Sequence, residues 1–530
     1  MNNIKLIDMK NKFLMVAWGL IFLSAPVAAQ TVYDAAKFVD KDLNGTARFV
    51  SMGGAMSALG GDISTMNTNP GGIGIYRSSD LQTTFGLSAY NSKSKTLDGT
   101  YKKDDLRGDF DQIGFVYSSK IGNTTALRYV NFGFNYRRAK SFYRKQRFSG
   151  GLGDFTQTLQ MAQQADGIKY DAWDNAFEND EIGWLSAIGY YGAVIDPVGE
   201  NEEYIGMYDQ GLGQLDVEER GGLDEYSFNL GLNFNDRVYL GFTLGINDMK
   251  YRKYTYYVED YPGTQLEGYD LASWNRIVGT GVNFKLGAIF RPFEDSPFRF
   301  GLAVHSPTFY DLEYKTSARL TSTVLDASDG NLYDYDVYTP DQISSRGEMV
   351  RPFKLNTPWL FNVSVASTVG SMFAFDAEYE YEDYSKLKFK DVDGYDEYMD
   401  FENSTRSMLK AVSTFKVGAE FKPIPEFGIR AGYNYRTAIF NDNAYKDLPY
   451  YSIQTDTDYA NTGDRHTVTF GVGYRGSMFY ADLAYKFDTY NSNMYPFVVK
   501  QGNVIYPSAS SVTKVTNSRS QALLTLGVRF

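Results

Sequence analysis

Apolar and polar residues alternate in many separate segments of this sequence, and that alternation limits its fold more than any other feature. In the segment YSFNLGLNF, Tyr226, Phe228 and Leu230 fall on one face of an extended strand, whereas Ser227 and Asn229 fall on the other. A period of two residues is that of a β-strand with two unlike faces. Aromatic residues recur on the apolar faces, which suits a wall between lipid and a polar interior. A soluble β-sandwich shows the same alternation, so the lengths of the connections are needed to distinguish it from a membrane barrel.

Short and long connections follow one another along the chain. The alternating segments lie at about 80–90, 111–119, 128–138, 224–235, 237–250, 274–291, 297–311, 347–367, 370–384, 409–421, 427–439, 464–475, 477–489 and 521–530. Short links such as Asn235-Asp236 are followed by long polar links, of which 139–223 is the longest. Bacterial transmembrane barrels have short periplasmic turns and long extracellular loops. We therefore predict an all-β fold, a 14-stranded antiparallel transmembrane β-barrel over residues 80–530.

The N-terminus has the features of a secretory signal peptide. Residues 1–29 contain lysines, an apolar run from Phe13 to Leu23 and a small-residue exit, VAA, so we expect cleavage before Gln30. Residues 30–79 then precede the first strand and form a separate segment. The exported chain is expected in the outer membrane of a Gram-negative bacterium, surrounded by lipid and lipopolysaccharide, with both termini periplasmic.

The C-terminal segment and the longest link each predict a specific feature. The last segment, QALLTLGVRF, alternates and ends in Phe530, which resembles the closing strand of bacterial outer-membrane barrels. It predicts the barrel assembly machinery as a partner. The 139–223 link holds apolar residues at helical spacing, so we expect short helices over the extracellular mouth.

Composition excludes several classes of function. The chain has no cysteine, which rules out disulfides, thiol catalysis and cysteine-bound metals. It has two histidines, so a histidine-rich metal or haem site is not expected, and no cofactor is predicted. A net charge of −12 without a basic run argues against nucleic acid as a partner. We expect a monomer that is not an enzyme.

A glycine-rich stretch lies just before the first strand, SMGGAMSALGGDISTMNTNPGGIG, from Ser51 to Gly74. Its glycines are followed by Asp62 rather than by a lysine, so it is not a phosphate-binding P-loop. A flexible linker would be polar, whereas methionine, leucine and isoleucine are scattered through this stretch. Small residues mixed with apolar ones suit a compact segment that packs closely against other backbone.

This stretch resembles the N-terminal hatch of the long-chain fatty acid transporter family (FadL/TodX type). The family has an Asn-Pro-Ala element there; Asn69 and Pro70 match it, and Gly71 takes the place of the alanine. The segments FKVGAEFKPIPEFGIRAGYNYRTA and DRHTVTFGVGYRGSMFYADLAYKF are similar to the family's late strand pairs. The resemblance implies a 14-stranded barrel plugged by a hatch over residues 30–79. The sequence departs from the family in its long 139–223 loop.

The resemblance also implies a function. It points to passive transport of hydrophobic, fatty-acid-like small molecules, captured by the extracellular loops and released by hatch movement. The hatch and gating residues that it nominates are Gly53, Gly54, Ala55, Gly60, Gly61, Asn69, Pro70 and Gly71. The small residues would let the hatch lie close to the inner wall, and the Asn-Pro-Gly group would turn it toward the first strand.

Charged residues in the strands are assigned to the lumen by their position in the alternation. An arginine or lysine facing lipid at the bilayer centre would cost about 2–4 kcal/mol. The lumen-facing candidates are His305, Asp376, Glu378, Arg430, Arg436 and Arg475. The arginines could hold a substrate carboxylate, or they could pair with the acids and fill the lumen, and the sequence leaves both readings open.

Other functions compete with transport. The 139–223 loop could serve an outer-membrane adhesin or a structural barrel. His305 and the adjacent Ser306 allow a barrel hydrolase, although the sequence nominates no third catalytic partner and places His466 near the outer interface. A polar porin is a further variant, but a plugged lumen would conduct small ions poorly.

Overall fold

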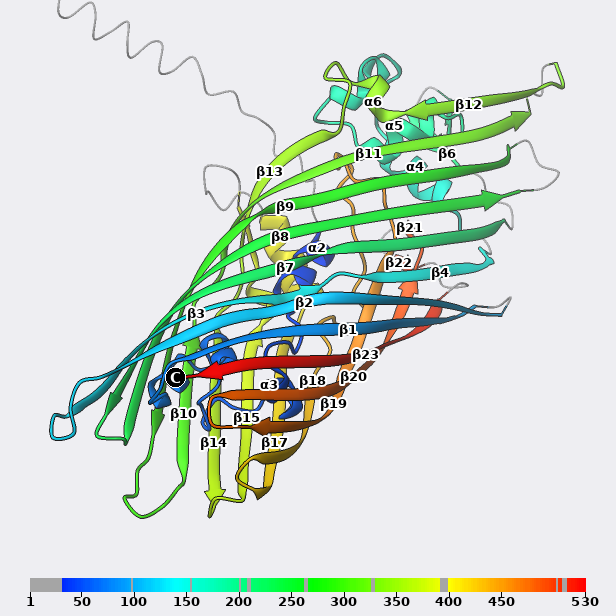
Figure 1. The fold of residues 1–530 in the computed structure, drawn as a ribbon. Coiled ribbons are helices and arrows are strands. Elements are labelled where there is room, and N and C mark those ends of the chain that lie inside the picture. Colours follow the sequence, from blue (N-terminus) through cyan, green and yellow to red (C-terminus); the bar gives the residue numbers. More distant parts are fainter. Residues whose placement is uncertain are drawn as a thin grey trace, which may run out of the picture.

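A computed structural model describes residues 31–96, 99–152, 155–199, 202–206, 211–261, 266–325, 329–390, 399–501, 504–507 and 512–530. The chain forms a closed 14-stranded antiparallel β-barrel with its N-terminal segment inside (Figure 1). This confirms the predicted fold. None of the helices in these ranges is long and apolar enough to span a membrane.

The wall strands pair with their neighbours in chain order, and the last pairs with the first. They are β1 (Asp80–Lys95), β2 (Thr100–Lys120), β3 (Leu127–Ser141) with β4 (Arg144–Gly151), β7 (Leu212–Phe234), β8 (Val238–Asp260), β9 (Leu266–Phe290), β10 (Arg299–His305) with β11 (Phe309–Leu325), β13 (Met349–Asn356) with β14 (Leu360–Val369), β15 (Phe373–Asp383) with β16 (Lys388–Lys390), β17 (Ala411–Ile424), β18 (Phe427–Arg436), β19 (Tyr459–Arg475), β20 (Phe479–Tyr495) and β23 (Thr513–Arg529). The pairing of β23 with β1 closes the barrel.

One end of the barrel carries the short turns. Asn235, Asp236 and Arg237 join β7 to β8. The φ angles of Asn235 and Asp236 are positive, 52° and 56°, as at the two central positions of a type I′ turn. The backbone N–H of Phe530 donates to Ser79 at the same end, at 3.0 Å. We call this the short-turn end and the opposite one the long-loop end. The membrane face at which each terminus lies stays a prediction.

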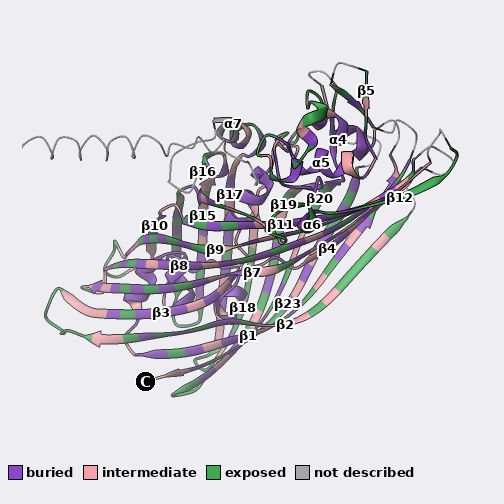
Figure 2. Cartoon of the chain, turned by 90° about the horizontal axis from the view of Figure 1, so that it is seen from above, coloured by how far each residue is buried: buried purple, intermediate pink, exposed green. Residues whose placement is uncertain are grey.

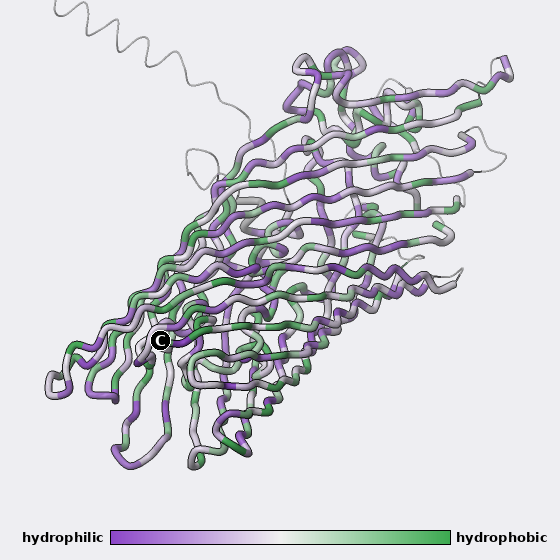
Figure 3. Tube along the Cα trace, in the orientation of Figure 1, coloured by the Kyte–Doolittle hydropathy of each residue, from purple (hydrophilic) through white to green (hydrophobic). Residues whose placement is uncertain are grey.

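The outer surface of the barrel is apolar and its lining is polar. Along the strands, buried and exposed residues alternate (Figure 2), and hydropathy alternates with them (Figure 3). Exposed residues include Leu81, Phe85, Phe228, Leu230, Phe242, Leu286, Phe361, Phe470, Leu483 and Leu526. Buried inward residues include Asn229, Asn233, Thr243, Thr469 and Asp482. Apolar residues outside and polar residues inside reverse the soluble arrangement and fit a lipid surrounding.

Two prolines interrupt strands that the sequence pattern shows as continuous. The predicted segments 297–311 and 347–367 are each split, by Pro307 and Pro358. Proline has no N–H and cannot donate to a ladder. Thr308 and Thr357 bridge the break instead: the backbone N–H of Thr308 donates to the Thr357 hydroxyl at 2.8 Å.

The predicted loop 139–223 is shorter in the structure. Strands β3 and β4 continue to Gly151, and β7 begins at Leu212. The outer halves of these strands carry charged residues, such as Asp216 and Glu218, on one face. These charges mask the alternation, although Leu215 and Val217 continue it on the other face. The wall therefore extends past the apolar belt, and the insert between β4 and β7 is confined to about 152–211.

The insert forms a small domain over the long-loop end, which we call the cap (described residues between 155 and 206). Its elements are α4 (Gln157–Ala165), η3 (Tyr170–Trp173), η4 (Ala176–Glu178), α5 (Trp184–Tyr191), β5 (Asp196–Val198) and β6 (Glu203–Ile205). Trp173 and Trp184 are almost fully buried in its core. The remaining outer elements are β12 (Leu332–Tyr338), α6 (Thr339–Gln342), η5 (Tyr384–Lys386), α7 (Met399–Met408), β21 (Val498–Gln501) and β22 (Val504–Pro507).

Residues 31–79 form the plug inside the lumen. It contains α2 (Val32–Val39), α3 (Ala47–Ser51), η1 (Ile63–Asn67) and η2 (Pro70–Ile75). Gly53, Gly54, Gly60 and Gly61 all have φ between 63° and 80°, a region that favours glycine. Thus four of the nominated hatch glycines occupy backbone conformations that other residues adopt only with strain.

Glycines of the wall face the plug at close range, and the sequence analysis did not single them out. A Cβ at Gly432 of β18 would lie 2.1 Å from the Gly53 nitrogen, and one at Gly241 of β8 would lie 2.1 Å from the Pro70 carbonyl carbon. Asn69 caps η2 and donates to the Ala288 carbonyl of β9 at 3.2 Å. Plug backbone and wall backbone therefore touch directly at both of these glycines.

Replacing a wall glycine should dislodge the plug. We expect Gly432→Val and Gly241→Val each to raise small-ion conductance in planar bilayers, because the new side chain occupies space that the plug backbone fills. Gly108→Val on β2 is the matched control, since a Cβ added at Gly108 would have no neighbouring atom within 4 Å. Equal conductance in all three variants and the parent protein would contradict this packing account.

Candidate ligand site beside the plug

Among the described residues, backbone pairing between neighbouring wall strands is missing over a long stretch beside β2. Residues 112–120 of β2 pair with β3, but, in the ranges that the structure describes, residues 100–110 of β2 pair with β1 alone, and Asp111 lies in a bulge of that ladder. On the other side, β4 pairs with β7 only. We call the interval between 100–111 of β2 and β4 the seam.

The seam arises where the chain turns inward between β3 and β4. The pairing of β3 with β7 shifts between Arg138 and Lys140, which pair with Asp224 and Leu223. The Phe142 N–H then donates to the carbonyl of Gly221, whose φ is 113°. Phe142 then points into the lumen, with its ring centroid 5.1 Å from that of Tyr251 and 6.2 Å from that of Phe38 in the plug. Burial of this aromatic ring holds β4 toward the plug and away from β2.

Side chains bridge the seam. The Lys145 ammonium lies 3.7 Å from the Asp105 carboxylate, and the Arg107 guanidinium lies 3.3 Å from the Tyr143 ring centroid. The Tyr90 hydroxyl of β1 donates to Ser141 at 2.8 Å. Exposed ion pairs and cation–π contacts contribute about 0–1 kcal/mol each. The seam can therefore open at a lower cost than an intact ladder.

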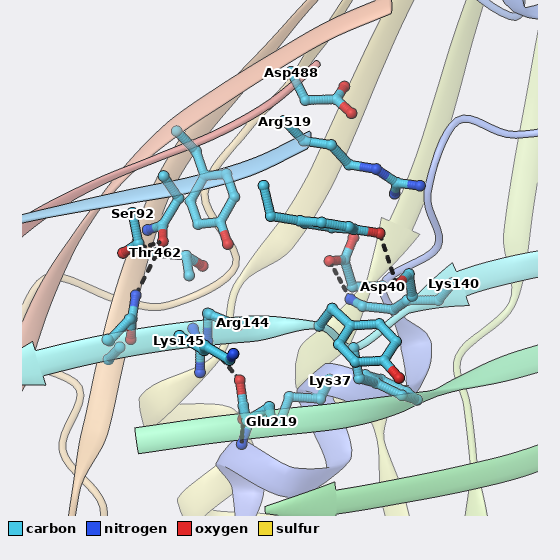
Figure 4. Close-up of a pocket in the computed structure, with 18 of the residues that line it drawn as sticks. Lys37, Asp40, Ser92, Lys140, Arg144, Lys145, Glu219, Thr462, Asp488 and Arg519 are labelled. Atoms are coloured by element: carbon cyan, nitrogen blue, oxygen red, sulfur yellow. Dashed lines mark hydrogen bonds and ion pairs between the residues drawn. The ribbon is translucent and has the colours of Figure 1, made fainter. Parts of the chain in front are cut away.

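A cavity of about 180 Å³ lies behind the seam, and we call it the outer cavity (Figure 4). Its walls come from α2 of the plug, from both edges of the seam and from β7, β19, β20 and β23. Its aromatic lining residues are Tyr33, Tyr90, Phe142, Tyr143, Phe440, Tyr459 and Tyr490. The cavity thus lies between the plug and the side wall of the barrel.

Charged groups in the outer cavity are paired across the plug–wall boundary. Glu219 of β7 accepts from Lys37 of the plug, at 2.9 Å, and from Arg144 of β4. The Tyr251 hydroxyl donates to the same carboxylate at 2.6 Å. A single buried carboxylate therefore fixes both the plug helix and the inward strand.

Asp40 and Asp42, just after α2, form a second set of pairs, which we call the Asp40 cluster. Asp40 binds Lys140 at 2.5 Å, Arg465 at 3.1 Å and Arg436, and Asp42 binds Arg519 at 2.9 Å. Burial alone would raise the pKa of Asp40, but the charges of Arg436, Arg465 and Lys140 outweigh it and hold that pKa well below its usual value. Asp40 is therefore ionised at neutral pH, and the cluster ties the plug to four wall strands, β3, β18, β19 and β23.

Asp40→Asn should loosen the plug without removing it. Breaking a buried ion pair costs about 3–5 kcal/mol because the remaining charges lose their partner. The lowered pKa of Asp40 means that this stabilisation is present above about pH 4 and is lost only as pH falls further. At neutral pH, we therefore expect faster hydrogen exchange of the α2 amides in the variant. Asp295→Asn, in an exposed turn, is the control; identical α2 exchange in both variants would contradict the role of the cluster.

The plug helix also contacts a long loop. Tyr33 stacks on Phe440 with centroids 4.5 Å apart, and Asp34 accepts from Gln454 at 3.1 Å. Buried Lys253 and Lys446 both bind Asp456 and hold this loop, residues 440–458, in the lumen. The loop and α2 are therefore in direct contact.

The lumen-facing candidates from the sequence lie inside the barrel but not in one site. The His305 Nε2 is 2.7 Å from the Thr68 carbonyl, and Asp376 accepts from the Ala58 and Leu59 amides. Glu378 binds Lys416, Arg430 binds Glu420 and Asp482, Arg475 lies 3.8 Å from Asp482, and Arg436 binds Asp40. Of the six, only Arg436 reaches the Asp40 cluster, and the others hold the plug or pair within the wall.

Sequence reasoning missed the residues that line the outer cavity, among them Lys37, Asp40, Lys140, Arg144, Glu219 and Arg519. A signal for some of them was present, because Lys37 and Asp40, like Asp34, are charges in or next to a mostly apolar plug helix. The others lie in segments assigned to a loop or a polar strand face, where a charge is unremarkable.

A closed barrel with a packed plug and an unpaired seam is a plugged β-barrel whose wall has a break in backbone pairing beside an internal cavity. No protein-family model matches the sequence, and no curated protein matches it. Among solved structures, it is similar to the P. putida toluene transporter TodX, with 13% identity, TM-score 0.47, and coverage of 92% of this chain and 99% of that one. It is also similar to a Pseudomonas aeruginosa FadL homologue, with 12% identity, TM-score 0.49, and coverage of 92% of this chain and 99% of that one. The Ralstonia pickettii toluene transporter TbuX has 13% identity and TM-score 0.43, with coverage of 92% of this chain and 99% of that one.

Proposed function

We propose that this protein is a passive outer-membrane transporter of hydrophobic small molecules. The observation that carries the proposal is the seam, a break in backbone pairing that lies next to an aromatic-lined cavity and includes the exposed apolar residues Leu106 and Phe110 of β2. A water-filled porin has no use for an opening toward lipid, whereas an apolar solute that leaves through the wall avoids crossing a polar lumen. The hatch-like sequence of the plug supports the same function.

In the proposed mechanism, the cap and long loops capture the ligand and pass it to the outer cavity. Fatty-acid-like molecules suit this cavity, since its rings can contact a hydrocarbon body while an ionised head competes for Lys37, Lys140 or Arg144. Such competition would weaken the pairs that hold α2. A shift of the hatch about its glycines, Gly53, Gly54, Gly60 and Gly61, with Asn69, Pro70 and Gly71 as the fixed turn, would then clear the way to the seam.

Uptake into proteoliposomes or cells tests the proposal. A long-chain fatty acid, an alkane and a monoaromatic hydrocarbon form the panel, with sucrose as the polar control. We expect the protein to accelerate at least one of the three by about tenfold, a barrier change of about 1.4 kcal/mol, and to leave sucrose unchanged. Acceleration of sucrose alone would identify a polar porin instead.

The other functions receive less support. His305 is buried against the plug, while His466 is exposed on the outer surface beside Tyr433, so the two histidines do not share a site. An adhesin would present binding residues on the cap, yet the largest cap side chains, Trp173 and Trp184, are buried. We further propose that the protein works as a monomer, assembled through its C-terminal strand by the barrel assembly machinery, among outer-membrane lipid and lipopolysaccharide.

A further inference from the structure

A second cavity lies on the other side of the plug segment that follows α2. It measures about 140 Å³ and is lined by plug residues on one side and by β3, β9 to β11, β14, β15 and β17 to β19 on the other. We call it the inner cavity. It shares Asp42, Arg465 and Asp488 with the outer cavity, so the Asp40 cluster forms the partition between the two.

Several buried polar groups of the inner cavity have no hydrogen-bond partner in the described structure. The Tyr310 hydroxyl and the Asn283 carbonyl oxygen belong to residues that are only 2% exposed, and the Thr68 hydroxyl is also unpartnered. Buried polar groups are almost always satisfied in native proteins. Their presence around one cavity indicates that a polar molecule occupies it.

Two opposite charges also lack partners there. Lys41 of the plug and Glu382 of β15 both line the cavity, and neither makes an ion pair or hydrogen bond through its side chain with any described residue. Lys41 acts electrostatically on Glu382 without forming an ion pair with it. Arg436, which also lines the cavity, acts on Glu382 more strongly, and Lys41 acts on Glu225 as well. Arg137 and Lys285, by contrast, share Glu225, and Lys416 binds Glu378 and Glu380.

We propose that the inner cavity is a binding site for a small zwitterion, whose carboxylate meets Lys41 and whose ammonium group meets Glu382. A hydrocarbon would leave the unpartnered hydroxyl and amide groups desolvated, at a cost of about 1–3 kcal/mol each. A simple anion would leave Glu382 without a partner. The proposal goes beyond hydrophobic transport, because nothing in a hydrophobic ligand matches these groups.

Binding to the purified full-length protein in detergent tests the site, with ω-amino acids of increasing length as probes. Glycine, β-alanine and 4-aminobutyrate vary the distance between the two charges, while acetate and methylammonium carry one charge each. By saturation-transfer NMR and calorimetry, we expect one of the three amino acids to bind best and the single-charge probes to bind about tenfold more weakly, a difference of about 1.4 kcal/mol.

Variants locate the site. Lys41→Met and Glu382→Gln should each weaken binding of the best amino acid about tenfold, and the exchanged pair Lys41→Glu with Glu382→Lys should recover part of it. Lys93→Met, outside the cavity, is the control, and the heat-modified gel mobility of each barrel checks its folding. If no amino acid binds, the cavity holds water alone. If acetate binds as well as the amino acids do, the cavity is an anion site. Either result would overturn the proposal. Hydrophobic uptake by the same variants is scored separately, so the two proposals can fail independently.

Discussion

Cross-linking the seam is expected to stop transport while leaving the barrel intact. In the variant Asp105→Cys with Lys145→Cys, a short bismaleimide would join β2 to β4 where the two native side chains lie 3.7 Å apart. The natural chain has no cysteine, so the reagent has only these two targets. We expect uptake of the best-transported hydrophobic compound to fall about tenfold or more after treatment, because the exit toward lipid cannot widen.

A second cysteine pair controls for the reagent itself. Lys93 of β1 and Lys102 of β2 are direct partners in an intact ladder near the same end of the barrel. Cross-linking Lys93→Cys to Lys102→Cys should leave uptake unchanged, since those strands are already joined by backbone hydrogen bonds. If both cross-links reduce uptake equally, or if neither does, the seam is not the route.

Removing the core of the plug is expected to convert the barrel into an open pore. A deletion of Thr46–Tyr76 removes α3, η1 and η2, together with the pairs that Arg48 makes with Glu420 and that Asp376 makes with the Ala58 and Leu59 amides. The remaining lumen is polar, so water and ions would fill it. We expect small-ion conductance in planar bilayers to rise by about tenfold or more, and hydrophobic uptake to lose its dependence on ligand structure.

A milder variant distinguishes the effect of losing the plug from the effect of misfolding the barrel. Arg48→Ala removes one buried contact between plug and wall and keeps the whole chain. It should give brief openings at low frequency, whereas the deletion should conduct continuously. Unchanged hydrophobic uptake and unchanged conductance in a correctly folded deletion variant would contradict a gating role for residues 46–76.

The barrel could be predicted from sequence because its determinants are local. Alternation such as Tyr226, Phe228 and Leu230 against Ser227 and Asn229 lies within single segments, and the lipid environment makes it uniform. Prediction was wrong about how far the strands extend, as in β7 above Leu223. Beyond the apolar belt, charged residues take the outward face and apolar residues such as Leu215 and Val217 face inward, so the lipid-facing pattern ends although the ladder continues.

The site could not be predicted because it depends on long-range register. Asp40 meets Lys140, Arg436 and Arg465 across 100, 396 and 425 residues of sequence. The seam is a stretch where two neighbouring strands do not pair, and no pattern in the sequence indicates where such a stretch begins. The plug was predictable in part, since its glycines are unusual, but the matching glycines of the wall, Gly241 and Gly432, become meaningful only once the plug lies beside them.

The most direct measurement of the central claim is mass spectrometry of the small molecules that remain with the protein after mild purification. Ala36 lines the outer cavity, so Ala36→Phe should fill it, while Ala431→Phe adds the same volume on the outer surface. We predict that the parent protein and Ala431→Phe retain the same hydrophobic or amphipathic small molecule and that Ala36→Phe loses it. Retention of the same molecule by all three proteins, or of bulk lipid alone, would contradict a ligand site beside the plug.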